Sequence, residues 1–170
     1  MKALVTIGLL ALAVVVQSVS GGFEWRGTPT VDLVLVVVVY VALTGGPVAG
    51  LLAGTVGGLV QDALSSGILG MGGLAKTVVG FLAGRLGTQF IVTATLPRIV
   101  TFAAATAAHA VLFMGAYSLL GLRSFPDPLT AVAIQAAGNG LAGVVVFTLG
   151  EWLPRAIDRR SASRGMRVKR

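Results

Sequence analysis

Ionisable side chains are scarce in the body of this chain, so each one raises the question of what chemistry it could do. Asp62 and Lys76 flank a glycine-rich turn. Charged groups inside a bilayer are costly, which makes each of them a functional hypothesis by default. We predict that Asp62 and Lys76 form an ion pair across the turn. The pair could hold the turn in place, or it could form a gate or a ligand site.

His109 is the only histidine, and it lies near the centre of a predicted apolar helix that contains no Cys, Asp or Glu. One histidine cannot build a metal site alone. We therefore predict neither a metal nor another cofactor. A hydrogen bond to a neighbouring helix is the expected role, and Gln135 and Asn139 are the candidate intramembrane partners.

Known catalytic templates are missing from the sequence. It has no Gly-x-Ser-x-Gly elbow, no His-Glu-x-x-His zinc motif, no phosphate-binding loop and no pair of intramembrane aspartates. The six acidic residues lie mostly at the ends of apolar segments. We predict that the protein is not an enzyme, and we keep an intramembrane enzyme only as a third alternative.

The composition identifies the environment in which these residues work. Of the 170 residues, 55% are hydrophobic and only 11% are charged, and the mean hydropathy is +0.92. A soluble domain needs about a quarter of charged residues to cover its surface. This excludes an ordinary soluble enzyme, a disordered protein and a nucleic-acid-binding domain. The absence of cysteine excludes disulfides and thiolate sites. The sequence therefore predicts an integral membrane protein.

Six apolar segments are predicted to be transmembrane helices, which makes the fold class an all-α six-helix membrane bundle. The second is rich in valine and is expected to begin before Val31. The first could instead be a cleaved signal peptide, but retention is favoured because every later segment is also membrane-like. The bundle is one domain over residues 1–153, followed by a basic tail over 154–170. The predicted spans cover residues 3–19, 31–44, 47–61, 74–92, 99–122 and 129–153.

Glycines recur every fourth residue along the third segment. A step of four keeps residues on one helix face, and a face without side chains lets another helix approach closely. This predicts a helix-packing interface, most simply with another helix of the same chain. Its residues are Gly46, Gly50, Gly54 and Gly58.

The positive charges predict the orientation. With six spans, ten basic residues lie on the side of both termini and three on the opposite side. The positive-inside rule then places both termini in the cytoplasm. The tail is predicted to contact anionic lipid, with a docking site for a cytosolic protein as the alternative. Its basic residues are Arg155, Arg159, Arg160, Arg164, Arg167, Lys169 and Arg170.

A series of short motifs follows the same order as in a known family. They are Thr30-Val31-Asp32-Leu33, Gly46-Pro47 before the glycine-studded helix, Gln61-Asp62, Leu69-Gly70-Met71-Gly72 and Leu74-Ala75-Lys76-Thr77, with a basic tail at the end. In this order and over essentially the whole length, the chain resembles MreD, the rod shape-determining membrane protein of bacteria.

The resemblance implies a non-enzymatic scaffold of the cell-elongation machinery in the bacterial inner membrane. It implies an MreC-like single-span partner. The resemblance further implies that the protein works with a RodA-type glycan polymerase, its transpeptidase and MreB filaments. It implies that the protein helps to control lateral peptidoglycan synthesis. It also implies a fold like that of the S component of vitamin-uptake transporters. The sequence leaves open whether the protein forms a homodimer. The alternative function is a small-molecule-binding transporter subunit with a polar cavity near Asp62, Lys76, His109 and Asn139.

Overall fold

The described part of the chain is almost entirely helical, which confirms the all-α prediction. The computed structural model describes residues 2–19, 24–25, 28–29, 31–65, 68–89 and 95–167. Besides the helices, these residues contain one two-residue antiparallel pair, β1 (Glu24–Trp25) with β2 (Thr28–Pro29). The helices are α1 (Lys2–Val19), α2 (Leu33–Gly45), α3 (Pro47–Leu64), α4 (Met71–Gln89), α5 (Thr95–Leu119) and α6 (Pro128–Arg167).

The start of α2 differs from the sequence-based expectation for a clear physical reason. α2 begins at Leu33 rather than before Val31, because the carboxylate of Asp32 accepts a hydrogen bond from the Leu35 amide (2.9 Å) and caps the first turn. α6 does not end at residue 153 but continues to Arg167, so most of the basic tail belongs to this helix.

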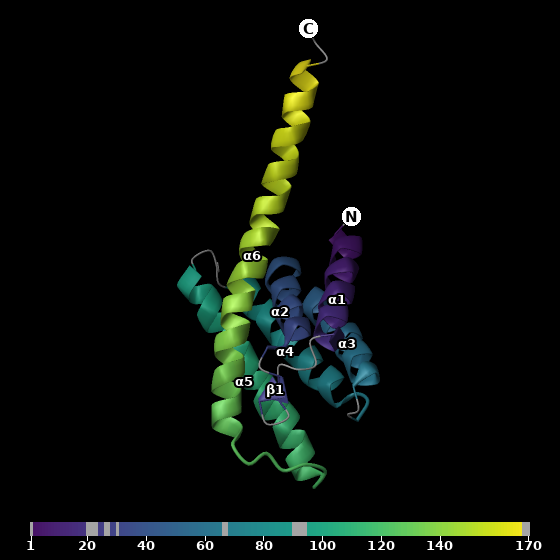
Figure 1. Ribbon diagram of the computed structural model, residues 1–170, viewed down its shortest axis with the longest axis vertical. Helices are drawn as coiled ribbons and strands as arrows, with labels where there is room; N and C mark the ends of the chain where they lie inside the picture. The colour runs from purple at the N-terminus through teal and green to yellow at the C-terminus, as the bar shows by residue number, and fades with distance from the viewer. Residues whose placement is uncertain are drawn as a thin grey trace.

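The short helix α2 occupies the centre of the bundle and contacts each of the other five helices (Figure 1). Eight of its residues are buried, among them Val34, Val38 and Val39. A helix with apolar residues on every face is buried, because each face has to pack against other apolar groups. On one side α2 packs against Phe102 of α5 and Phe147 of α6. The run of valines thus forms the core of the bundle.

The helices α3 and α4 pack against each other through backbone rather than side chains. A Cβ on Gly50 would collide with the Gly80 carbonyl, one on Gly54 with the Lys76 carbonyl, and one on Gly58 with the backbone of Gly73. The partner of the glycine face is therefore a helix of the same chain. The hydroxyls of Thr55 and Thr77 also meet across this interface at 2.8 Å.

Gly46 has a different position from the other three glycines of the predicted row. It lies between α2 and α3 with a positive φ of 87°, a conformation that favours glycine, and apart from its chain neighbours no described atom lies within 4 Å of where its Cβ would be. It allows the chain to turn directly into Pro47, the first residue of α3.

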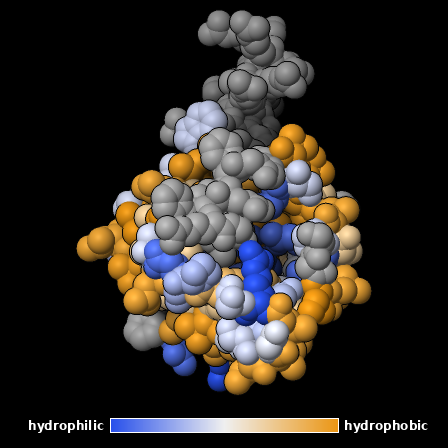
Figure 2. Space-filling view, turned by 60° about the horizontal axis from the view of Figure 1, so that its bottom comes forward, coloured by the Kyte–Doolittle hydropathy of each residue, from blue (hydrophilic) through white to orange (hydrophobic). Residues whose placement is uncertain are grey.

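The outside of the bundle is apolar. In the part of the chain that the structure describes, three helical segments are long and apolar enough to cross a membrane: Pro47–Leu64, Thr95–Leu119 and Pro128–Trp152. Val5–Val19 and Leu33–Gly45 are shorter apolar helices. Figure 2 shows one end of the molecule, where hydrophilic residues gather toward the middle and hydrophobic residues lie around them. These features are those of a membrane protein, and the crossing of all six helices stays a prediction.

Candidate functional site

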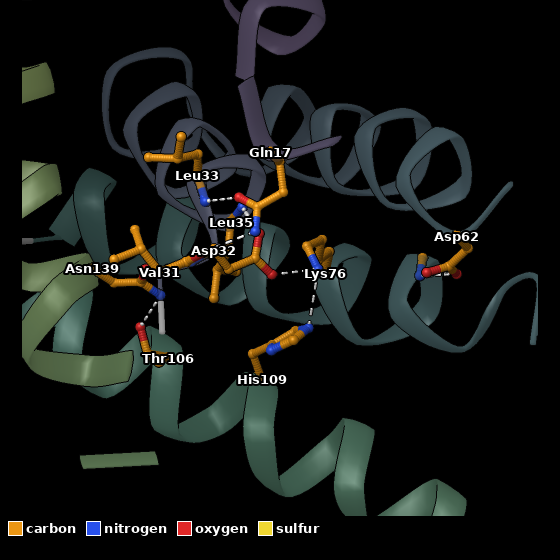
Figure 3. Close-up of polar contacts among 11 residues, drawn as sticks. Gln17, Val31, Asp32, Leu33, Leu35, Asp62, Lys76, Thr106, His109 and Asn139 are labelled. Atoms are coloured by element: carbon orange, nitrogen blue, oxygen red, sulfur yellow. Dashed lines mark hydrogen bonds and ion pairs between the residues drawn. The ribbon is translucent and has the colours of Figure 1, made fainter. Parts of the chain in front are cut away.

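Three ionisable side chains from three helices meet inside the bundle (Figure 3). The Nζ of Lys76, on α4, lies 2.7 Å from Oδ2 of Asp32 at the start of α2. The same Nζ lies 3.3 Å from Nε2 of His109 on α5. All three residues are buried, with exposed fractions of 6% or less. We call this group, together with the polar side chains that surround it, the polar centre.

Asp32 also connects the polar centre to α6. Its backbone amide donates a hydrogen bond to Oδ1 of Asn139 (2.8 Å), and Nδ2 of Asn139 donates to the hydroxyl of Thr106 on α5 (2.9 Å). The Thr106 hydroxyl in turn donates to the carbonyl of Phe102. The polar atoms of Asn139 are thus satisfied inside the protein, as burial requires.

Gln17 brings α1 into the same network. Its Nε2 donates to the carbonyl of Val31, and its Oε1 accepts from the amide of Leu33, both at 2.9 Å. The start of α2 is therefore held by α1, α4 and α6, and through Lys76 by α5 as well. Only α3 contributes no side chain to these contacts; its Gly54 packs on the backbone of Lys76.

The contact with Lys76 determines the tautomer of His109. A lysine ammonium can only donate, so Nε2 must accept, and the ring proton is assigned to Nδ1. Among the described residues, no group accepts a hydrogen bond from this buried Nδ1. The ring stacks on Phe113, one turn further along α5, with 5.7 Å between ring centroids.

The polar centre has the geometry of a structural contact between helices. One carboxylate and one ammonium neutralise each other, and the described residues contain no group of three His, Cys, Asp or Glu that could hold a metal. A buried ion pair adds little net stability, but it penalises any arrangement in which one partner stands alone. The polar centre therefore fixes how α2, α4 and α5 align.

Comparison with known proteins identifies the family. The family model described as rod shape-determining protein MreD matches residues 1–135. The chain belongs to the MreD family. This membership gives the protein a role in determining rod shape within the cell-shape machinery. The MreD family consists of shape-determining membrane proteins and is not a known enzyme family. No curated protein and no solved structure matches the chain.

The stretch that matches the MreD model contains most of the polar centre. Gln17, Asp32, Lys76 and His109 lie within residues 1–135. Asn139 and the part of α6 that follows Gln135 lie beyond it. The polar centre thus combines side chains inside the matched region with one from the part of α6 that follows it.

The predicted ion pair between Asp62 and Lys76 is wrong in this MreD-family chain. Lys76 points toward α2 and α5 and pairs with Asp32, while Figure 3 shows Asp62 apart from that group. Oδ2 of Asp62 instead accepts hydrogen bonds from the amides of Gly70 (2.9 Å) and Gly73 (3.0 Å). The carboxylate thus holds the turn before α4 against the end of α3.

Asn139, one of the two residues predicted as partners of His109, has other hydrogen-bond partners. His109 contacts Lys76, whereas Asn139 bonds to Asp32 and Thr106. Gln135 is buried on α6, one helical turn before Asn139. Sequence reasoning missed Gln17. A signal was present, because Gln17 is the one amide side chain in a mostly apolar helix.

Loss of the Asp62 carboxylate should loosen the α3–α4 turn and leave the polar centre intact. We expect Asp62→Ala to cost about 1–3 kcal/mol, because two backbone N–H groups lose their acceptor. Hydrogen exchange in detergent should accelerate at the amides of Gly70 and Gly73. Asp62→Asn keeps one acceptor oxygen and should give an intermediate rate. Unchanged exchange at both amides would contradict the assignment.

Proposed function

We propose that this MreD-family protein is a non-enzymatic scaffold of the bacterial cell-elongation machinery. In this proposal it lies in the inner membrane with both termini in the cytoplasm. It binds an MreC-like single-span protein and thereby helps to control lateral peptidoglycan synthesis. Family membership carries the proposal, since a shape-determining membrane protein must act on the machinery that builds the wall.

Two features of the structure support a scaffold. The polar centre joins its ionisable groups to one another across α2, α4 and α5, as a contact that holds helices together would. The exterior of α3 and α4 carries exposed apolar residues such as Leu52, Val56 and Leu74. Such faces suit contact with lipid and with a partner helix.

The proposed mechanism is positional. A groove between helices would hold the single helix of the MreC-like partner and so place its periplasmic domain near the synthases, a RodA-type polymerase and its transpeptidase. MreB filaments lie on the cytoplasmic side, where the basic tail would meet anionic lipid headgroups. The tight α3–α4 packing supports this mechanism, because a scaffold must keep its shape.

Affinity capture tests the proposal. The full-length tagged chain is purified in a mild detergent, and co-purifying chains are identified by mass spectrometry. We expect a single-span protein with a periplasmic domain at near-stoichiometric yield. We also expect loss of rod shape when the chain is depleted. Retention of rod shape without the chain would contradict the proposal.

A small-molecule-binding subunit is the second candidate, and one observation favours it. The buried Nδ1 of His109 has a proton to donate and no acceptor among the described residues. Native mass spectrometry of the purified chain separates the two functions. A bound metabolite that disappears in His109→Phe would favour the transporter subunit.

A further inference from the structure

The helices of the bundle end at different heights on the side opposite the N-terminus, which we call the far side. Figure 1 shows α5 and α6 reaching well beyond the end of α1 on that side. The exposed apolar residues of α1 run from Val5 to Val19, about 21 Å of helix. Those of α5 run from Leu96 to Leu119, about 35 Å. The apolar surface is therefore much shorter along α1 than along α5.

Hydrogen bonds of the polar centre show how these heights relate to one another. The side chain of Gln17 on α1 bonds to the backbone at the start of α2. The amide of Asp32, also at the start of α2, donates to Asn139 of α6. Gln17 and Asn139 therefore lie at nearly the same level. From this level α1 continues only about 3 Å to Val19, whereas α6 continues about 17 Å to Pro128.

On the opposite side, which we call the near side, the two helices end together. Val5 of α1 lies about 18 Å from the level of Asn139, and Leu149 of α6 about 15 Å. Trp152 is 63% exposed, and tryptophan favours the membrane–water interface, so we place the near boundary there. The hydrocarbon is about 30 Å thick. In a flat bilayer α1 would then end about 7 Å short of the far boundary, and α6 would pass it by about 7 Å. A helix tilt of about 20° shortens these heights by only about 6%.

The exposed face of α1 has the character of a lipid contact. Interfaces between membrane helices favour small residues, whereas bulky apolar side chains are exposed along the whole of α1. Lipid-exposed backbone within the hydrocarbon must be helical. The next described element after α1 is the two-residue strand β1, which begins with the charged Glu24. The hydrocarbon beside α1 should therefore end where the helix ends. The bulky residues are Val5, Ile7, Leu12, Val15 and Val19.

We propose that the bilayer thins beside α1, by about 7 Å on the far side, and keeps its full thickness beside α5 and α6. A segment shorter than the hydrocarbon can thin the lipid around it at a modest cost per ångström. The step belongs to the fold, because Gln17 and Asp32 hold α1 and α2 at the level of Asn139. Neighbouring proteins with equally short spans would share the thinned lipid, since two such faces together deform less bilayer than two apart.

Spin labels at matched positions measure the thinning. The chain has no cysteine, so Val19→Cys and Leu129→Cys each carry one label, and both native side chains are 83% exposed. The full chain is reconstituted alone in dioleoyl-phosphatidylcholine vesicles, and each depth is read from collisions with oxygen and with a water-soluble nickel complex. We expect both labels at nearly the same depth, in the headgroup region, although they lie about 12 Å apart along the bundle.

A depth difference of about 12 Å between these labels would overturn the proposal. The label at position 19 would then lie in hydrocarbon of ordinary thickness, and the short face of α1 would be left for a protein partner.

A second pair of labels on the near side detects a tilt of the whole protein. Val5→Cys and Leu149→Cys should lie within about 3 Å of each other in depth if the bilayer thins. A tilted protein in a flat bilayer would equalise the far labels and separate the near ones by about 12 Å. Equal depths on the far side with separated depths on the near side would therefore also overturn the proposal.

Neither the MreC-like partner nor the orientation of the chain enters these measurements, because the protein is reconstituted alone and depth is measured from both surfaces. A failed affinity capture would leave the thinning unaffected, and a flat bilayer would leave the scaffold function unaffected.

Discussion

Replacing Lys76 with methionine is expected to destabilise the protein more than removing the whole ion pair does. The single change leaves the Asp32 carboxylate buried opposite an apolar side chain, which typically costs about 3–5 kcal/mol. The double variant Asp32→Asn/Lys76→Met leaves no unpaired charge and should recover most of this loss. The measurement is the fraction of monodisperse protein that survives heating in detergent.

A matched control exists on the same helix. Arg85 is exposed near the far end of α4, so Arg85→Met removes a cation without leaving a buried charge. It should survive heating like the wild type. If Lys76→Met and Arg85→Met behaved alike, or if the double variant were less stable than the single one, the polar centre would not align the helices as described.

Gly54→Leu is expected to prevent α3 and α4 from packing. A leucine at this position would meet the carbonyl of Lys76 and the amide of Thr77, and backbone cannot move aside as a side chain can. Overpacking in a core costs about 1–3 kcal/mol even when side chains adjust, and here we expect more. Folded yield, co-purification of the partner and rod shape should all be lost.

The control for this prediction is Gly115→Leu. Outside its chain neighbours and its own helix backbone, no described atom lies within 4 Å of a Cβ at Gly115, on α5, and leucine is the better helix former. This variant should express and co-purify normally. Equal folded yields of the two leucine variants would show that the α3–α4 interface tolerates side chains.

The sequence could predict features that lie within one helix. The step of four between Gly50, Gly54 and Gly58 defines a face whatever the partner is, and in the structure α4 lies on that face. The valine run of α2 likewise indicated a helix, but its central position could not be read from it. That position depends on where the other five helices pack.

The contacts of the polar centre could not be predicted, because they join distant parts of the chain. Asp32 and Asn139 are 107 residues apart, and Lys76 and His109 are 33 apart. From the sequence, either Asp32 or Asp62 could have been the ion-pair partner of Lys76. Asp62 is nearer to Lys76 in sequence. In the structure, however, the side chain of Lys76 extends from α4 toward α2 and α5 and therefore pairs with Asp32.

The shortness of α2 has a consequence for how the protein enters its membrane. Its 13 residues rise about 20 Å, less than the roughly 30 Å of hydrocarbon. A segment of this length is a poor substrate for insertion on its own. The Gly46-Pro47 turn joins it directly to the longer α3. Biogenesis should therefore deliver α2 and α3 to the bilayer as one helical hairpin, before later segments close around them.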